Sequence, residues 1–445
     1  MDKKKKAQKK GGDQTTTAPS CSGGEKEHKK NWREVYATPE EIERFLKDHI
    51  YLQRNVVTMR TEWREPSSYD SDGTEVWQPM SDWKLNSLWK LMQKEKPVIY
   101  DHMRKVVESD SFPDYHPFRY YLEHLPPWDG QDHILSMSVS VTVKGDVEEQ
   151  MRFYEYLKKW LVAMVAGWVD DREVSHVILI FIGEQGIYKT TWFNYILPPE
   201  LRRYFYTKTN SGRMTKDDLL TLAQYGLVCY EELDTMSSRE LNQLKSVVTM
   251  PSVDERAAYA HFAEHRKHIA SFCGTGNNVQ FLSDTTGTRR WLPFEVESIE
   301  SPRDNPFDYE GIYGQAYALY QQGFQYWFSP QEIRLLSAHN KKFETANDAA
   351  DLVSYYFAKP SGANVGEFIP TAVAQQIVSA PGTRVSTVAL GRAFSRLGFE
   401  GATVDNCRGY YAVRLNDDER RQRARSLAYG ASRESLQMTD DTDGF

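Results

Sequence analysis

A chain of 445 residues is long enough for two or three domains of ordinary size, each with its own buried core. Its 40% hydrophobic and 26% charged residues are typical of globular domains, and no apolar run reaches the roughly 18 residues that a transmembrane helix needs. The net charge of −7 excludes nucleic-acid binding over the whole surface, and the four scattered cysteines exclude structural zinc and a disulfide framework. We therefore expect a cytoplasmic protein with no membrane partner.

The amino-terminal segment 1–34 begins with MDKKKKAQKK and continues with small polar residues. Because it offers little to pack, it predicts a disordered basic tail. A flexible arm whose lysines contact phosphates is the alternative. No apolar stretch follows the lysines, so the segment is not a secretory signal.

Residues 35–145 predict an N-terminal module of helices and strands. Thr38 followed by Pro39 is typical of a helix N-cap and first helical position. Alternating side chains over 51–64 predict a strand, and apolar spacing over 83–107 predicts helices.

Residues 146–328 predict a second, larger domain. Residues 153–169 have the periodicity of an amphipathic helix. The runs 177–182, 227–230 and 269–273 are almost wholly apolar, as in parallel strands buried on both faces. Strands alternating with helices predict an α/β fold with a parallel sheet flanked by helices.

A glycine-rich turn joins the first of these strands to a helix. Its residues are Gly183, Glu184, Gln185, Gly186, Ile187, Tyr188, Lys189, Thr190 and Thr191. Such a loop wraps phosphates with backbone N–H groups, neutralises them with a lysine and offers a hydroxyl to Mg²⁺. Lys189 and Thr190 have the required spacing from Gly183, so the turn predicts a site for ATP and Mg²⁺. An ordinary strand–turn–helix with a surface lysine is the alternative.

Tyr188 departs from the usual pattern, in which a glycine precedes the lysine. That position often requires close backbone approach, so we expect the tyrosine to weaken nucleotide binding or to move the loop. Whether the loop supports turnover is left open by this departure.

Glu231 and Glu232 end the second strand. We expect Glu231 to hold Mg²⁺ together with Thr190, and Glu232 to polarise the attacking water. Adjacent acids are often only a solvated strand end. Their place some forty residues after the phosphate-binding turn favours the catalytic role.

Polar residues also follow the third strand. Asn277, in GTGNN, is placed to contact the γ-phosphate and to orient water, although glycine and asparagine also favour plain turns. Arg289 and Arg290, in TGTRRW, can stabilise charge on a transferring phosphoryl group in their own subunit or across a subunit boundary. Paired surface arginines are common, so only the order of the motifs makes them specific.

In this order the motifs resemble the virulence-associated E (VirE) family of P-loop proteins, relatives of the superfamily 3 helicases and of phage and plasmid primase-helicases. The resemblance covers about 77–296, roughly half of the chain. It rests on HPFRYYLEHLPPWDG, GEQGIYKTT, LVCYEELD, the stretch 245–256 with Tyr259, FCGTGNN and FLSDTTGTRRW. It supplies no primase, because the N-terminal module holds no convincing acidic triad.

The resemblance implies a P-loop NTPase of the AAA+ type that assembles into homo-oligomeric rings, a hexamer among them, and acts on single-stranded or forked DNA. Asn277 then corresponds to the first sensor. Arg289 or Arg290, with a slight preference for Arg290, corresponds to the arginine finger. Lys245 and Arg256 correspond to a basic segment that faces DNA.

Residues 329–416 predict a small C-terminal module, followed by a charged tail over 417–445. Residues 385–399 predict a helix that carries Arg392 and Arg396, and a basic, aromatic strand comes after it. This pattern suits a winged-helix-like DNA-binding module. A small packing domain with a solvated basic helix face is the alternative.

These features predict an ATP-driven DNA helicase or translocase of a mobile element or phage-like replicon. The alternative, motivated by Tyr188, is an ATP-gated protein that binds DNA or assembles without unwinding it. A structural protein with a decayed phosphate-binding loop is a third class.

Overall fold

The computed structural model describes residues 35–67, 77–209, 216–255, 264–282, 288–345, 348–361, 366–379 and 385–422. The predicted tail 1–34 and most of the predicted tail 417–445 lie outside these ranges. The chain divides into two compact units between His124 and Leu125. Within the described ranges, no helix has both the length and the apolar character that crossing a bilayer requires.

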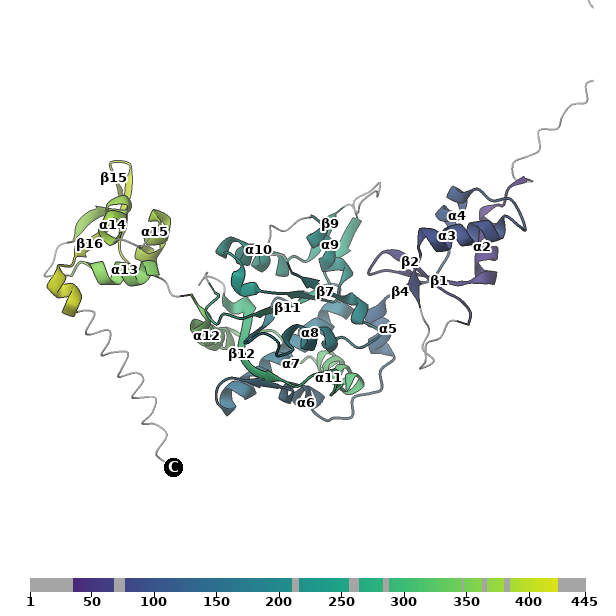
Figure 1. The fold of residues 1–445 in the computed structure, drawn as a ribbon, viewed down its shortest axis with the longest axis horizontal. Coiled ribbons are helices and arrows are strands. Elements are labelled where there is room, and N and C mark those ends of the chain that lie inside the picture. The colour runs from purple at the N-terminus through teal and green to yellow at the C-terminus, as the bar shows by residue number, and fades with distance from the viewer. Residues whose placement is uncertain are drawn as a thin grey trace, which may run out of the picture. The chain divides into compact units, whose positions relative to one another are not determined.

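The first unit holds a small sheet and short helices (Figure 1). Its elements are α2 (Pro39–His49), β1 (Tyr51–Asn55), β2 (Arg60–Arg64), β3 (Gln78–Pro79), α3 (Asp82–Met92), α4 (Tyr100–Val107), β4 (Asp114–Tyr115) and α5 (Pro117–Glu123). The strand order is β3-β2-β1-β4. Thr38 caps α2 through a reciprocal pair of hydrogen bonds with Glu41, and Pro39 opens the helix, so the predicted N-terminus is confirmed.

The single strand predicted over 51–64 is wrong, because the chain reverses there. β1 and β2 pair antiparallel, with Leu52 opposite Trp63, and both of these side chains lie in the core. Burial does not alternate strictly in either strand, since Leu52 and Gln53 are both buried in β1 and the last three residues of β2 are all buried. The turn contains no glycine or proline to mark it, and Met59 takes the positive φ of 55° instead.

The second unit is built on a six-stranded sheet with the order β5-β12-β6-β11-β8-β7 (Figure 1). The strands are β5 (Val141–Val143), β6 (Ile178–Ile182), β7 (Phe205–Lys208), β8 (Leu227–Tyr230), β11 (Ser271–Gly276) and β12 (Trp291–Ile299). β5 pairs antiparallel with β12, and the other neighbours run parallel. The predicted α/β fold is confirmed.

Helices cover both faces of this sheet (Figure 1). They are α6 (His133–Val139), α7 (Val147–Val169), α8 (Lys189–Ile196), α9 (Lys216–Gln224), α10 (Ser238–Val248), α11 (Tyr309–Gln321) and α12 (Pro330–His339). The same unit has four short 3₁₀ turns among its described residues, η1 (Arg202–Tyr204), η2 (Leu233–Thr235), η3 (Thr288–Arg290) and η4 (Asn340–Phe343). It also has a hairpin of β9 (Ser252–Glu255) and β10 (Glu264–Lys267). Phe181 of β6 contacts Phe153 of α7 and Phe193 of α8. Its neighbour Ile180 packs in the core that includes Leu244 of α10. Burial from both sides explains why β6 is continuously apolar.

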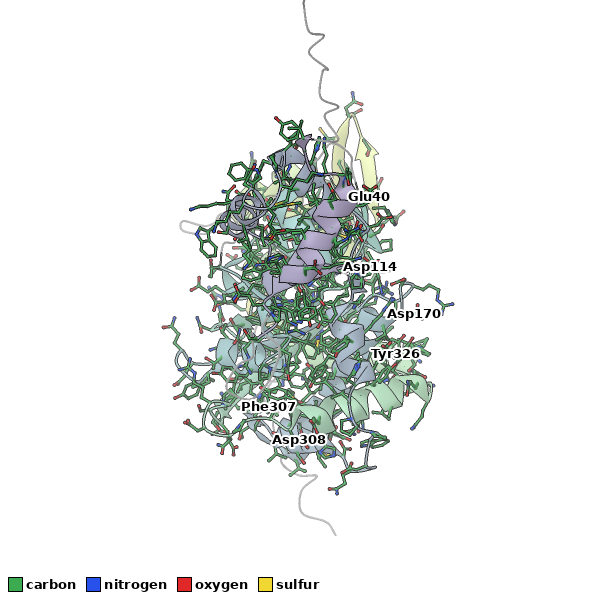
Figure 2. The ribbon with its side chains drawn as sticks, turned by 90° about the vertical axis from the view of Figure 1, so that its right-hand side faces the viewer. Glu40, Asp114, Asp170, Phe307, Asp308 and Tyr326 are labelled. Atoms are coloured by element: carbon green, nitrogen blue, oxygen red, sulfur yellow. The ribbon has the colours of Figure 1, made fainter. Side chains whose placement is uncertain are left out.

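Two aspartates labelled in Figure 2 secure α11 at its ends. Asp308 caps its start, accepting the N–H of Gly311 at 3.1 Å, and pairs with Nδ1 of His133 in α6 at 2.9 Å. Asp170, the C-cap of α7, accepts the hydroxyl of Tyr320 at 3.2 Å. α11 is therefore fixed to both α6 and α7.

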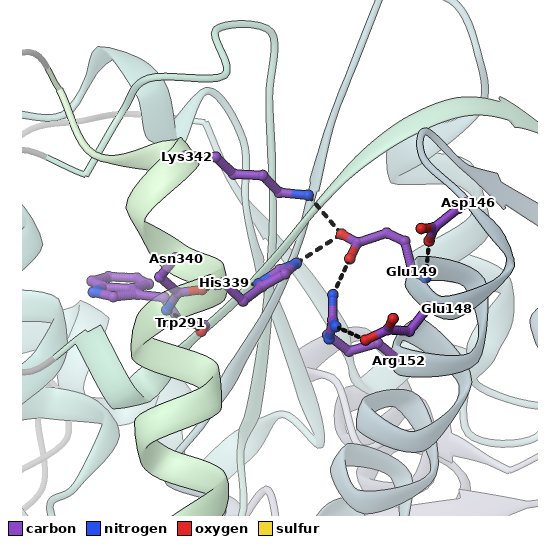
Figure 3. A network of polar contacts seen from close by, with 8 residues as sticks. All are labelled: Asp146, Glu148, Glu149, Arg152, Trp291, His339, Asn340 and Lys342. Atoms are coloured by element: carbon purple, nitrogen blue, oxygen red, sulfur yellow. Dashed lines mark hydrogen bonds and ion pairs between the residues drawn. The ribbon is translucent and has the colours of Figure 1, made fainter. Parts of the chain in front are cut away.

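A buried carboxylate joins α7 to the segment after the sheet (Figure 3). Glu149 Oε1 lies 2.7 Å from His339 Nε2 and 2.6 Å from Lys342 Nζ, while Oε2 pairs with Arg152. Burial alone would raise the pKa of Glu149, but the hydrogen bonds from His339 and Lys342 lower it to about 2. Glu149 therefore stabilises the fold in its ionised form, through its contacts with His339 and Lys342.

The structure shifts both internal boundaries that composition suggested, at 145 and 328. α6 and β5 belong to the second unit, and α12 with η4 packs on its sheet. Asn340 donates to the carbonyl of Trp291 at 3.0 Å, and Phe343 is buried in the same core as Ile180. Composition changes locally, whereas these contacts join residues far apart in the chain.

Replacing Glu149 by glutamine is expected to lower the free energy of unfolding at neutral pH by about 2 kcal/mol. The lowered pKa corresponds to about 3 kcal/mol, and we expect less because Lys342 is 42% exposed and its charge is screened. The folded pKa lies below the ordinary 4.5, so the contribution is present above about pH 4.5 and is lost toward about pH 2. Urea unfolding at several pH values measures it.

Glu148→Gln is the matched control, because Glu148 also pairs with Arg152 but its side chain is 79% exposed. We expect a loss below about 0.5 kcal/mol there. Equal losses in the two variants, or a Glu149→Gln deficit that does not shrink in acid, would contradict the assignment.

The C-terminal segment has its own core, which includes Val353, Phe394 and Tyr410. Its elements are α13 (Asp348–Tyr356), β13 (Phe357–Ala358), β14 (Glu367–Pro370), α14 (Thr371–Val378), α15 (Thr387–Arg396), β15 (Gly401–Val404) and β16 (Cys407–Arg414). β16 pairs with β13, β14 and β15. Asp405 and Asn406, at φ 49° and 59°, form the tight turn of the β15–β16 hairpin.

Candidate active site

The loops after β6, β8 and β11 meet at one edge of the sheet. These strands are neighbours and run parallel, with Gly276 opposite Ile182 and Gly274 opposite Tyr230. Their carboxyl ends therefore deliver the predicted phosphate-binding turn, the acid pair and Asn277 to the same place, which is where α/β sheets bind ligands.

The predicted phosphate-binding turn is held close to the strands beside it. Gly183 donates its N–H to the carbonyl of Gly276 at 3.2 Å. A Cβ on Gly183 would lie 2.5 Å from the carbonyl oxygen of Val296 in β12, so only glycine fits. Gly186 has a φ of 87°. Along the rest of the turn Glu184, Gln185 and Gly186 are exposed, while Ile187 and Thr191 are half-buried.

Tyr188 adopts a conformation that glycine takes more easily. Its φ is 67° and its ψ 17°, in the left-handed region, and the residue is 45% exposed. For a residue with a Cβ this conformation costs about 1–2 kcal/mol. Tyr188 is thus nearly half exposed, and the backbone makes the turn into α8 without a glycine.

Lys189 is buried inside the turn. Its ammonium donates to the carbonyls of Gly183 at 2.7 Å and Glu184 at 2.5 Å, and to Asn277 Oδ1 at 3.3 Å. These contacts use the three protons that an ammonium offers. Burial lowers the pKa of Lys189, and the negative charge of Asp234 opposes that shift.

Thr190 and Glu231, predicted to share the metal, are brought together. The Thr190 hydroxyl donates to Glu231 Oε1 at 2.9 Å. A hydroxyl beside one carboxylate fits Mg²⁺, which keeps most of its ligands as waters and substrate phosphates. Glu232 follows with φ 54° and is exposed. Among the described residues, no hydrogen bond joins its carboxylate to the turn.

Asp234 also lies at this edge, and it was not among the residues predicted for the site. Its Oδ2 accepts the N–H of Asn278 at 3.0 Å. The available signal was its position in YEELD, three residues after Glu231. An acid beyond a strand end has no periodic pattern, so only the fold reveals its partner.

Arg289 and Arg290 lie at the other end of the strands, where β6 and β12 begin. They form η3 directly before β12, whose first residue, Trp291, is opposite Ile178 at the start of β6. Arg289 is exposed and Arg290 half-buried. Burial lowers the pKa of nearby His176, and the charge of Arg290 lowers it further. The arginines are therefore separated from the turn in their own subunit by the length of β6.

The residues predicted to face DNA have different surroundings. The placement of Lys245 on a DNA-facing surface is wrong, because it is only 6% exposed and its Nζ lies 5.9 Å from the centre of the Trp291 ring. Arg256 lies outside the described residues. Arg392 and Arg396 are exposed on α15, as an interface would need.

The sequence of this domain matches a known family. A model of the virulence-associated protein E-like domain covers residues 122–345, about half of the chain. The chain belongs to this family. The virulence-associated protein E-like domain thus contains the whole edge where Lys189, Glu231 and Asn277 meet, and it includes Arg289 and Arg290.

Solved structures are similar only in outline. The apo NrS-1 C-terminal region is 12% identical with a TM-score of 0.45, covering 85% of this chain and 100% of that one. A type IV SCCmec protein, Cch, described as an active helicase, is 12% identical with a TM-score of 0.39, covering 83% of this chain and 93% of its own. At this level neither supports a functional assignment. Curated proteins gave no match.

Proposed function

We propose that this chain is a P-loop NTPase of the AAA+ type that binds ATP with Mg²⁺ at the loops after β6, β8 and β11. The observation that carries the proposal is the meeting of Lys189, Thr190, Glu231 and Asn277 at one edge of a parallel sheet. The first turn of α8 has backbone N–H groups without helical acceptors, which suit phosphate oxygens. Bound Mg²⁺ would neutralise charge on the phosphates between Thr190 and Glu231.

In this proposal the side chains of the chain have separate tasks. Lys189 exchanges the carbonyls of the turn for phosphate oxygens, to which it binds more strongly because both partners are charged. Asn277, already 3.3 Å from Lys189 Nζ, is within reach of the same phosphate. Glu232 accepts the proton of the attacking water.

We further propose that hydrolysis drives movement along single-stranded or forked DNA, as in a helicase or translocase of a mobile element or phage-like replicon. Family membership supports a role of this kind. The C-terminal segment adds support, since a helix, two short strands, two helices and a hairpin follow in an order similar to that of a winged helix. In such modules the second helix of the pair enters the DNA groove, and here α15 exposes Arg392 and Arg396.

ATP hydrolysis measured with and without single-stranded DNA tests both parts. We expect hydrolysis that DNA stimulates, and displacement of a strand from a forked duplex. An inactive wild-type protein would remove the ATPase proposal. Hydrolysis that does not respond to DNA would remove the motor.

The second candidate is an ATP-gated protein that assembles or binds DNA without unwinding. Tyr188 favours it, because a left-handed tyrosine makes the turn harder to rearrange around phosphates than glycine would. Sizing with ATP, with ADP and without nucleotide, paired with strand displacement, separates the two. Nucleotide-dependent assembly without displacement would favour this candidate.

Glu232→Gln is expected to leave ATP bound and to slow hydrolysis about 10²- to 10⁴-fold, because a positioned base is lost while the size of the side chain is kept. Calorimetry and a single-turnover assay measure the two effects. Glu231→Gln is the comparison, and its defect should ease at high Mg²⁺. Equal losses of binding and turnover in Glu232→Gln would place Glu232 at the metal or in the fold instead.

A further inference from the structure

The turn after β8 lies directly over the end of β11. A Cβ on Gly274 would lie 2.2 Å from Leu233 Cδ1, and a Cβ on Gly276 would lie 3.0 Å from Asp234 Oδ1. Side chains of η2 thus lie close to both glycines of the GTG sequence, and Ile182 of β6 lies closer still to Gly276. Leu233 is fully buried, so it anchors the turn on the strand.

Asp234 bonds to the loop that carries Asn277. Its Oδ2 accepts the N–H of Asn278 at 3.0 Å. Its Oδ1 is shielded from solvent and has no hydrogen-bond partner among the described residues. A buried carboxylate oxygen without a donor is unfavourable by about 1–3 kcal/mol. The carboxylate makes one backbone hydrogen bond at this cost, which points to a role in positioning the loop that carries Asn277.

The same loop also contacts the phosphate-binding turn. The carbonyl of Gly276 accepts the N–H of Gly183 at 3.2 Å, and Asn277 Oδ1 accepts from Lys189 at 3.3 Å. The end of β11 therefore lies between two neighbours, the turn after β6 and the turn after β8. Asp234 is the described residue of η2 whose side chain hydrogen-bonds across that gap.

We infer that Asp234 is a positioning residue: its carboxylate holds the Asn278 backbone so that Asn277 reaches Lys189 and the phosphate bound there. Its effect on turnover rests on the proposed function, whereas the tether itself does not. Asp234 touches neither substrate nor metal in this role. A displacement of about 1 Å at Asn277 is expected to slow the chemical step about 10²-fold.

Four variants test this role: Asp234→Ala, Asp234→Asn, Asn277→Ala, and the double variant of Asp234→Ala with Asn277→Ala. Asp234→Ala should lower kcat about 10²-fold, with the Kd for ATP changed less than about threefold. Asp234→Asn should keep most activity, because its amide oxygen can still accept the Asn278 N–H. In the Asn277→Ala background the Asp234→Ala change should add little, since it acts through Asn277. Additive losses would mark a general packing defect and overturn the inference.

Hydrogen exchange of the Asn278 amide without nucleotide gives a readout that needs no activity. Asp234→Ala should exchange faster, and Asp234→Asn should match the wild type. If Asp234→Ala does not fold, Asp234→Glu keeps the charge but moves the acceptor by one methylene, and it should both exchange faster and turn over more slowly. Unchanged exchange in the folded variants overturns the tether. Faster exchange in a protein whose wild type hydrolyses nothing leaves the tether standing and removes the ATPase proposal.

Discussion

A Lys189→Ala protein is expected to bind ATP about 10²-fold or more weakly and to lose measurable hydrolysis. The ammonium is the charged donor inside the phosphate-binding turn, only 8% exposed and already hydrogen-bonded to three oxygens. Each charge-assisted hydrogen bond to a phosphate contributes about 1.5–3 kcal/mol, and about 1.4 kcal/mol is a factor of ten. Two such bonds therefore account for the expected loss.

Titration calorimetry with ATP and Mg²⁺, alongside a hydrolysis assay, measures both effects. Lys341→Ala, at an exposed position in η4, is the control and should match the wild type. Thermal unfolding must also be compared, because removing the amine leaves the carbonyls of Gly183 and Glu184 without this donor. Unchanged affinity in a folded Lys189→Ala protein would show that the turn is not a nucleotide site.

Local chemistry explains why the meeting of these side chains at one end of the sheet was predictable. A wholly apolar run predicts a strand buried on both faces, and such strands are parallel. Parallel neighbours end at one edge, so Thr190 and Glu231 meet although 41 residues separate them. Lys189 and Asn277 meet across 88 residues for the same reason.

Contacts between residues that belong to no periodic pattern could not be predicted from the sequence. Glu149 and His339 lie 190 residues apart, and neither belongs to a motif, so the packing of α12 and η4 on the sheet was missed. Lys245 resembles a surface lysine in its helix, yet the fold buries it beside Trp291. In each case tertiary packing decides the environment, and a lysine or histidine has no intrinsic preference strong enough to reveal it.

The position of the arginine pair decides on which subunit it could act. Within one subunit Arg289 and Arg290 begin β12 at the level of Ile178, whereas the phosphate-binding turn begins after Ile182. Four strand steps separate the two levels by about 13 Å. An arginine there cannot reach the phosphates of its own turn, so a catalytic role requires a neighbouring subunit.

Arg290→Ala and Lys189→Ala proteins, each inactive alone, are therefore expected to regain hydrolysis when mixed. An arginine finger contributes about 10³- to 10⁵-fold to turnover, so activity of the separate variants should be near background. In a ring assembled at random from equal amounts, roughly a quarter of the interfaces combine an intact turn with an intact arginine. The same mixture with Arg289→Ala decides which arginine serves, since one is exposed and the other half-buried.

A protein with both Lys189→Ala and Arg290→Ala is the control partner. Mixed with Lys189→Ala it supplies no intact turn at any interface, so no hydrolysis should return, whatever the oligomer. Co-purification through two different tags must show that mixed oligomers form. If they form and neither arginine variant recovers activity, the pair serves the fold: both side chains then act beside His176 at the amino ends of β6 and β12, where Arg290 is already partly withdrawn from solvent. Recovery with one variant alone would instead assign that arginine to the neighbour's phosphates, because its own lie beyond reach at the far end of β6.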